Sequence, residues 1–187
     1  MNDDFDLYSG QEDYGIGDPI RFFYAEHERQ KALCDRLDRL IEPIKLERVK
    51  PEANILVRFL THDLRMHIAD EEHDLLPMLE LRCLSEDGLD GIMGQIRHEH
   101  EMDIDLVDFL LDDLKTLARG GTLHNPTRLF INLKEFTATQ RRHLEWENST
   151  ILPLAEKRLG EEDLCELRQN MTARRGNHSD TPITEPT

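Results

Sequence analysis

The chain has 187 residues, and its 39 Asp and Glu residues outnumber 23 Lys and Arg, giving a net charge of −16. A nucleic-acid duplex or an anionic membrane would repel such a chain, so we expect neither as a partner. The sequence lacks both the ~20-residue apolar run of a membrane span and the charge order of a signal peptide. Three cysteines without a CxxC motif exclude a disulfide framework. These features predict a single cytoplasmic domain.

The acidic charge is concentrated at the two ends of the chain. Residues 1–18 contain six acidic residues and no Lys or Arg, and residues 176–187 contain two acidic residues and no base. Segments of this kind rarely bury enough apolar surface to fold. We therefore predict a flexible acidic segment at 1–17, a folded domain at 18–174 and a disordered tail at 175–187.

The residues between these ends have the composition and the 3.6-residue apolar periodicity of helices, with few strand signals. Signals that start a helix occur four times, and signals that stop one occur three times. The starts lie at Asp18-Pro19, near Pro51, at Ser85-Glu86-Asp87 and at Asn125-Pro126, and the stops lie at Pro43, Gly120-Gly121 and Gly160. These boundaries define four helices with short connections.

A proline and a last amphipathic segment complete the expected fold. Pro77 stands late in the second helix, where it predicts a kink or an end. Residues 161–174 have the pattern of a short further helix. The predicted fold class is all-α: an up-down-up-down four-helix bundle with a short fifth C-terminal helix.

The polar positions of the helices form an internal repeat. Residues 67–77 and 143–153 share the pattern H-x3-E-[EN]-x3-L-P, and residues 26–28 and 99–101 are both Glu-His-Glu. The order along the chain is therefore EHE, HxxxE, EHE, HxxxE. This order indicates two helical hairpins built on one pattern.

The connections between the helices place four histidines at the same height in the bundle. His27 and His67 are equally far from the first connection, and His100 and His143 are equally far from the Gly-Gly stop. His67 and His100 are likewise equally far from the connection before the third helix. Each of the four also lies on the apolar stripe of its helix. We therefore expect their side chains to meet in the core.

Two glutamates follow the histidines of the second and fourth helices by four residues. This spacing is about 40° around a helix and about 6 Å along it, so each glutamate shares a face with its histidine. A metal site would remove the cost of burying four imidazoles and two carboxylates. Six ligands exceed a tetrahedral zinc site and suit two iron ions, with manganese as the alternative. The predicted ligands are His27, His67, Glu71, His100, His143 and Glu147.

These motifs identify a family resemblance over about residues 18–160. The chain resembles the hemerythrin-like (HHE cation-binding) domains, and the resemblance implies that the six residues bind two iron ions with oxo or hydroxo and carboxylate bridges. Ile104 stands where oxygen-carrying hemerythrins have a further histidine, and Glu147 stands where they have an aspartate. The ligand set is more similar to that of the bacterial iron-centre repair proteins, whose cysteine-bearing N-terminal domain this chain lacks. A ferritin-like site is disfavoured because Gln140 replaces the acid that would precede His143.

Several polar residues near the predicted site are expected to lie off its face. His98 points about 200° away from His100 and cannot share its direction. Glu72 and Asn148 are predicted to face away from the core, with a supporting contact to a metal ligand as the alternative for Glu72. Asp63 and Asp74 lie near the direction of His67, and either could accept its second N–H or lie at the edge of the apolar stripe. The side chains of His62 and His73 are expected to be in solvent, since they lie roughly 120–140° from the direction of His67.

The site indicates a non-haem di-iron protein that binds or senses O2, NO or peroxide in oxidative or nitrosative stress. The partner is then a small diatomic or peroxide ligand. Three alternatives stay open: a di-iron peroxidase or oxidoreductase, an iron storage or donor protein, and an adaptor whose metal is structural. The sequence also leaves open a protein partner, and whether the chain is a monomer or a homodimer.

Overall fold

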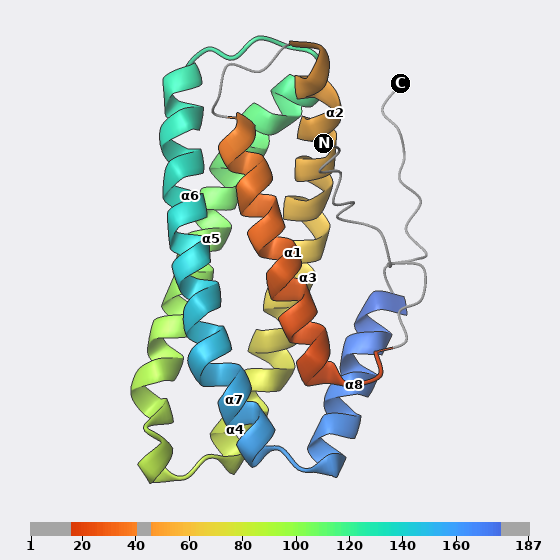
Figure 1. The fold of residues 1–187 in the computed structure, drawn as a ribbon, viewed down its shortest axis with the longest axis vertical. Helices are drawn as coiled ribbons and strands as arrows, with labels where there is room; N and C mark the ends of the chain where they lie inside the picture. Colours follow the sequence, from red (N-terminus) through yellow and green to blue (C-terminus); the bar gives the residue numbers. More distant parts are fainter. Residues whose placement is uncertain (1–15, 41–45, 177–187) are drawn as a thin grey trace.

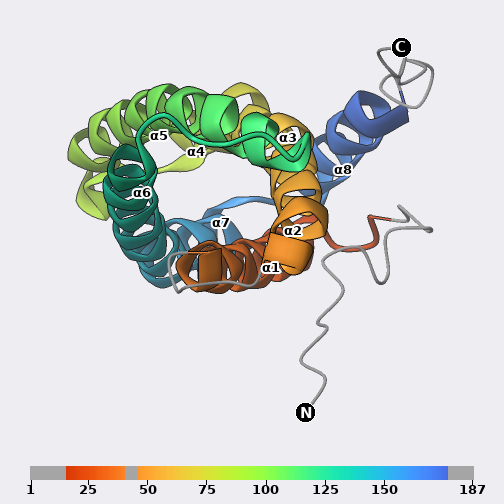
Figure 2. The ribbon, with the colours of Figure 1, turned by 90° about the horizontal axis from the view of Figure 1, so that it is seen from above.

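The computed structural model describes residues 16–40 and 46–176, and every regular element in these ranges is helical. Four long helical segments surround a common axis, and a shorter helix lies outside the ring that they form (Figures 1 and 2). The elements are α1 (Pro19–Leu40), α2 (Leu46–Arg58), α3 (Leu64–Asp70), α4 (Leu76–Arg82), α5 (Leu89–Ala118), α6 (Pro126–Trp146), α7 (Leu152–Arg158) and α8 (Glu161–Gly176). The all-α four-helix bundle with a fifth C-terminal helix is therefore confirmed.

Three π-helical turns join the shorter helices into the long segments. Phe59–Asp63 connects α2 to α3, Glu71–Leu75 connects α3 to α4, and Glu147–Ile151 connects α6 to α7. The second segment of the bundle is thus α2 through α4, and the fourth is α6 with α7. Two of the three turns begin at a glutamate of the sequence repeat.

The prolines of the repeat explain two of these turns. Pro77 and Pro153 lack the N–H that would bond four residues back, and their rings would collide with that carbonyl in a regular helix. In the wider turn, the N–H of Leu76 donates to the carbonyl of Glu71, and the N–H of Leu152 donates to that of Glu147. The chain therefore passes each proline without ending, and Pro77 is accompanied by a π-turn.

Some helix boundaries differ from those predicted. The second segment begins already at Leu46, so that Pro51 lies inside α2. Ser85–Asp87 forms a separate 3-10 turn, and α5 starts only after Gly88, whose φ of 66° suits glycine. The cap at Asn125 is confirmed, because its side chain accepts from the N–H of Arg128 at 3.0 Å. Residues 1–15 and 177–187, which include most of both predicted tails, lie outside the described residues.

The interior consists of two apolar clusters with a polar band between them. One cluster, which includes Leu33, Leu60 and Phe136, lies toward the α5–α6 connection. The other, which includes Phe23 and Ile96, lies toward the α4–α5 connection. The buried polar and charged side chains at the middle of the bundle separate the two clusters. A band of this kind is costly without partners, and it marks the level at which a functional site is expected.

Helix α8 docks on the outside of the bundle through apolar and ionic contacts. Its Leu167 and Met171 are fully buried. Near its end, Arg174 pairs with Asp70 of α3 and with Asp74, and Arg175 pairs with Asp70 at 2.6 Å. Leu167 and Met171 thus form the inward face of this helix.

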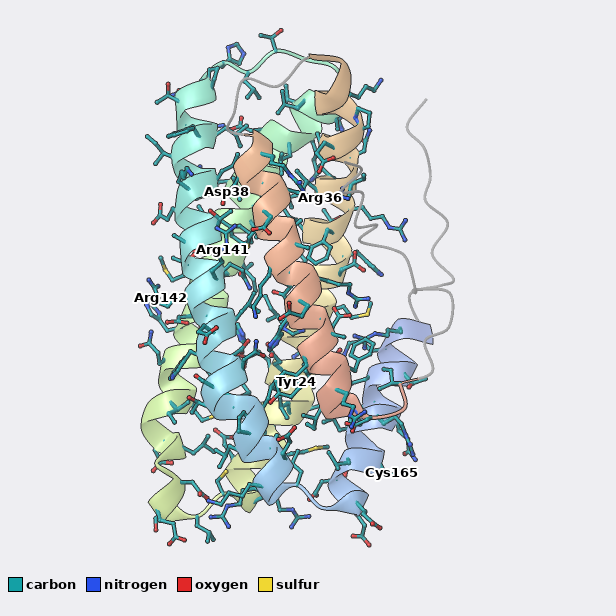
Figure 3. The ribbon with its side chains drawn as sticks, viewed as in Figure 1. Tyr24, Arg36, Asp38, Arg141, Arg142 and Cys165 are labelled. Carbon is teal, nitrogen blue, oxygen red and sulfur yellow. The ribbon has the colours of Figure 1, made fainter. Side chains whose placement is uncertain are left out.

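Polar contacts also tie the two outer segments of the ring together. Arg141 of α6 reaches Asp35 at 2.7 Å and Asp38 at 2.9 Å, and Figure 3 shows Arg141 and Asp38 side by side between α6 and α1. Among the described residues, no helix is long and apolar enough to span a bilayer.

Candidate metal centre

The six predicted ligands meet in the polar band. His27 comes from α1, His67 from α3, His100 from α5 and His143 from α6, while Glu71 and Glu147 open the two π-turns that follow α3 and α6. None of the six is more than 3% exposed. The four helices thus bring together residues that lie as far apart as 27 and 147 in the chain.

The six side chains form two groups of four. One group holds His27 and His67 and the other holds His100 and His143, and both groups contain Glu71 and Glu147. In each group, one ligand atom from every residue lies within 4.8 Å of the others. Two glutamates shared by two pairs of histidines are the arrangement that bridging carboxylates between two cations require.

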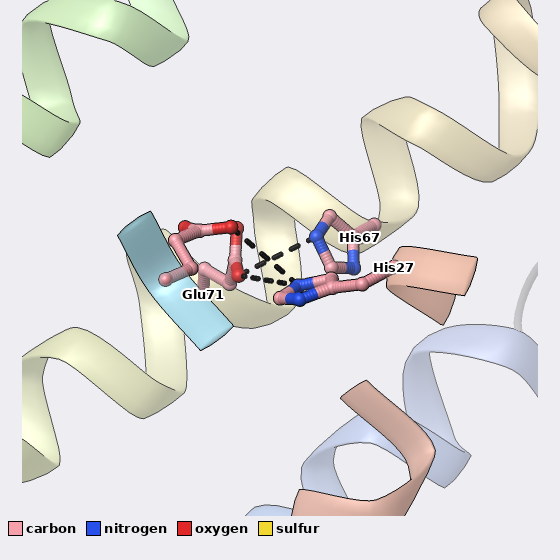
Figure 4. Close-up of side chains that lie close together, drawn as sticks. His27, His67 and Glu71 are labelled. Carbon is pink, nitrogen blue, oxygen red and sulfur yellow. Dashed lines mark ion pairs between the residues drawn. The ribbon is translucent and has the colours of Figure 1, made fainter. Parts of the chain in front are cut away.

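The distances show both carboxylates at the centre of the arrangement. Glu71 Oε1 lies 3.4 Å from His67 Nε2 and 3.7 Å from His27 Nε2, and its Oε2 lies 3.3 Å from His100 Nε2. Glu147 Oε1 lies 3.1 Å from His143 Nε2. In Figure 4 the rings of His27 and His67 turn toward the Glu71 carboxylate. Each glutamate therefore contacts histidines of both hairpins.

The buried atoms at the centre lack hydrogen-bond partners. Within residues 16–40 and 46–176, the Nε2 atoms of His27, His67 and His100 have none, and neither do the two carboxylate oxygens of Glu71 or those of Glu147. Buried polar atoms are otherwise almost always paired, and unpaired ones cost free energy. Nitrogen and oxygen lone pairs directed at a common point fit metal cations, so the residues present suit the metal group that the sequence predicts.

Outer hydrogen bonds fix three of the four rings. The Nδ1–H group of His27 donates to Asn148 Oδ1 at 2.7 Å, and that of His100 donates to Glu72 Oε1 at 2.6 Å. The Nδ1–H group of His143 donates to a carboxylate oxygen of α5. Such bonds hold the ring so that Nε2 points toward the centre, where a cation could replace its proton. Glu72 and Asn148 were predicted to face away from the core. Both side chains do point away from the inward face of their own helix, but each accepts a hydrogen bond from a histidine of a neighbouring helix.

The acceptor for His143 is Glu99, whose Oε2 lies 2.8 Å from the ring nitrogen. Among the described residues, His67 Nδ1 has no partner. The predicted candidate Asp74 instead accepts from Asn170 at 2.8 Å and pairs with Arg174. His67 is therefore held by packing rather than by an outer hydrogen bond.

The charges of the centre shift the pKa values of its members in opposite directions. Burial opposes ionisation of Glu71, but the surrounding His67, His100 and His27 bring its pKa well below the ordinary value. Burial, together with the neighbouring His27, His100 and His143, lowers the pKa of His67 to about 3. Burial also opposes the charge on His100, yet the neighbouring carboxylates of Glu71 and Glu72 raise its pKa to about 9. The carboxylates are thus ionised, as cation ligands must be.

The rival histidines lie elsewhere. His98, His62 and His73 are exposed, which confirms that they face away from the centre. Ile104 is partly buried against the apolar cluster that lies toward the α5–α6 connection.

Three further polar residues were missed from the sequence. Gln30, Asp103 and Gln140 are buried, and each stands three residues from a predicted histidine ligand on the same helix. Burial raises the pKa of Asp103 to about 6. The spacing of three residues, which keeps a side chain on the inward face, was a signal that could have found them.

The fold and the site together define a class: a helical bundle that can hold cations between two histidine pairs and two shared glutamates. The chain belongs to the family described as "Hemerythrin HHE cation binding domain", whose profile matches residues 18–155. No curated protein and no solved structure matches the chain.

Proposed function

We propose that this chain is a non-haem di-iron protein that binds O2, NO or peroxide and acts in oxidative or nitrosative stress. The observation that carries the proposal is the sharing of Glu71 and Glu147 by both histidine pairs. A single tetrahedral zinc ion would leave two of the six residues without a role, whereas two ions use all of them. Iron is preferred over manganese because imidazole outnumbers carboxylate in the set.

The chain's own residues have three tasks in this proposal. Four histidines and two glutamates hold the ions, Glu72, Glu99 and Asn148 orient three of the rings, and the two apolar clusters exclude bulk water. Iron bound there would supply open coordination positions and a change of oxidation state. The enclosure by four helices favours a ligand of two to four atoms over a bulky substrate.

A di-iron peroxidase or oxidoreductase is the second candidate, and Asp103 is the observation that favours it. Its carboxyl is 5% exposed, and burial raises its pKa to about 6, so that it can hold a proton close to neutral pH. General acids in enzymes are tuned in this way. A protein that turns over peroxide without losing iron would favour this candidate over simple binding.

The experiment is to purify the protein aerobically, to measure iron per chain, and to record the visible spectrum before and after reduction and exposure to each gas and to peroxide. We expect about two irons per chain and a spectrum that responds to one of these ligands. His67→Ala with His143→Ala should abolish metal uptake, and the exposed His98→Ala is the matched control. Zinc, or no metal, in protein grown with ample iron contradicts the proposal. Release of iron to an apo-acceptor would instead favour the storage or donor role.

The cytoplasmic location, a protein partner and the choice between monomer and homodimer stay predictions from the sequence. So do the boundaries at residues 17 and 174, although α8 continues to Gly176.

A further inference from the structure

A layer of polar side chains lies about one helical turn from the histidines, on the side of the α5–α6 connection. Gln30 follows His27 by three residues on the ascending α1, and Gln140 precedes His143 by three on the descending α6 (Figure 1). Gln30 is 1% exposed and Gln140 is 3% exposed. Asp103, which is also buried, adds a third polar group from α5 at this level.

The two glutamines bond each other and are only half satisfied by doing so. The Gln140 Nε2 amide donates to Gln30 Oε1 at 2.8 Å. Gln30 Nε2 and Gln140 Oε1 have no hydrogen-bond partner in the described part of the chain. If both amides were turned over, the hydrogen bond would run the other way and one N–H2 group and one oxygen would again remain. The pair therefore always presents one unused donor and one unused acceptor.

The opposite side of the centre is different. There Phe23 and Ile96 are fully buried and apolar. The carboxylates of Glu71 and Glu147 also approach from that side, because each follows its histidine by four residues on a descending helix. The face of the centre that neither Glu71 nor Glu147 occupies is thus the face next to the glutamine pair and Asp103.

A structural purpose does not explain this pair. Apolar side chains would fill the same space in a bundle core without unpaired polar atoms, and buried amides with unused hydrogen bonds lower stability. Groups of this kind gain partners when a polar molecule enters between them. Asp103 is a further buried polar group at the same level.

We propose that Gln30 and Gln140 form the hydrogen-bonding side of the ligand site, and that they select a ligand of the hydrogen peroxide type over apolar diatomic gases. Such a ligand carries an O–H that can donate to Gln140 Oε1 and oxygens that can accept from Gln30 Nε2. This inference rests on the proposed metal centre and narrows its ligand from three candidates to one class.

The test uses the full chain with volume-conserving substitutions: Gln30→Met, Gln140→Met and the double variant. Gln169→Met, at an exposed position on α8, is the matched control. After the iron content has been checked, each protein is tested with three probes that differ in hydrogen bonding. Hydrogen peroxide donates and accepts, azide only accepts, and nitric oxide does little of either.

We expect the double variant to react with hydrogen peroxide about tenfold more slowly or worse, to bind azide a few-fold more weakly, and to bind nitric oxide as the wild type does. Equal losses for all three probes, or no loss for peroxide, would overturn the inference. The single variants provide the same comparison if the double variant does not fold.

A measurement without metal separates a ligand-binding role from a structural one. The metal-free double variant should be at least as stable to denaturant as the wild type, since both unpaired atoms are removed together. A clear loss of stability in the double variant but not in Gln169→Met would mean that the pair serves the fold and would overturn the inference. Wild-type protein that takes up no iron would overturn the proposed function as well, whereas loaded wild type with an unaffected double variant overturns this inference alone.

Discussion

The two halves of the bundle, α1 through α4 and α5 through α7, follow one sequence pattern but support their histidines differently. In both halves, the residue after the shared glutamate crosses to the other half: Glu72 accepts from His100, and Asn148 accepts from His27. This exchange explains the [EN] position of the repeat. Each half therefore orients one ring of the other.

The two halves differ in the contacts made by the first glutamate of their Glu-His-Glu sequences. Glu99 accepts from His143 within the second half. Its counterpart Glu26 pairs with Arg29 on its own helix, and His67 Nδ1 has no partner among the described residues. In the second half, a glutamate of the same half thus orients the histidine that precedes the shared glutamate. The first half has no such bond among the described residues.

The first half has an external support instead. Asp70 and Asp74, which flank Glu71, pair with arginines of α8. The matching positions of the second half are Trp146 and Thr150, which have no carboxylate to offer. The comparison teaches that one repeat can be stabilised by second-layer hydrogen bonds or by a docked helix, with the same residues at the centre.

The shared glutamates give the largest expected effect, because they belong to neither half alone. Glu71→Ala should abolish high-affinity binding of both cations, and so should Glu147→Ala, since each removes a residue from both groups. Metal content after purification measures this. The exposed Glu145→Ala is the control. A variant that keeps one tightly bound cation would show that the halves bind independently.

The docked helix gives the next largest effect. Arg174→Met with Arg175→Met leaves the Asp70 carboxylate buried without a cation, and burial already raises the pKa of this group. Removing the partners of a buried charge costs about 3–5 kcal/mol. Denaturant unfolding of the metal-free protein measures the loss, with the exposed Arg168→Met as control. Equal stability of the two proteins would mean that α8 does not brace the first half.

The outer carboxylates should separate the halves directly. Glu99→Gln removes the charged acceptor of His143, and changes of this kind lower metal affinity about 10–100-fold. Glu26→Gln, at the matching position of the repeat, should change the affinity little because Glu26 pairs with Arg29 and does not accept a hydrogen bond from His67. Competition with a chelator gives both values. A similar fall of metal affinity in the two variants would contradict the proposed difference between the two halves.

The smallest effect concerns the link between the halves at Asp87. Its carboxylate accepts from Arg158 of α7, from the N–H of Leu84 and from Lys157, and these bonds hold its pKa well below the ordinary value. A lowered pKa means that the folded state binds the proton less readily than the unfolded chain, so the contribution to stability is present above about pH 4 and is lost as the pH falls further.

The corresponding measurement is the free energy of unfolding of the wild type and of Asp87→Ala between neutral and acid pH. The wild type should be more stable at pH 7, and the difference should shrink below about pH 4. A difference that grows as the pH falls contradicts the assignment.

The sequence was sufficient for what helix geometry determines. The common height of the four histidines follows from the segment lengths and the rise per residue. This common height alone predicts that His27 of the first half lies close to His143 of the second half. The direction of a side chain around its own helix was less informative about its contacts with neighbouring helices. Glu72 and Asn148 leave their own apolar face as predicted, but a long side chain at the edge of one helix reaches the next.

Local and tertiary effects account for the remaining differences. The 3-10 turn before α5 depends on the left-handed Gly88, which capping signals alone do not reveal. Gln30 and Gln140 are polar residues at inward positions, and nothing in a single helix shows that two such positions face each other across α1 and α6.

The most direct test of the account is a crystal structure of the iron-loaded protein with anomalous diffraction at the iron edge. We predict two iron positions, one beside His27 and His67 and one beside His100 and His143, with both glutamates between them. A single iron position, or iron bound away from Glu71 and Glu147, would contradict the central claim that the two halves share one centre.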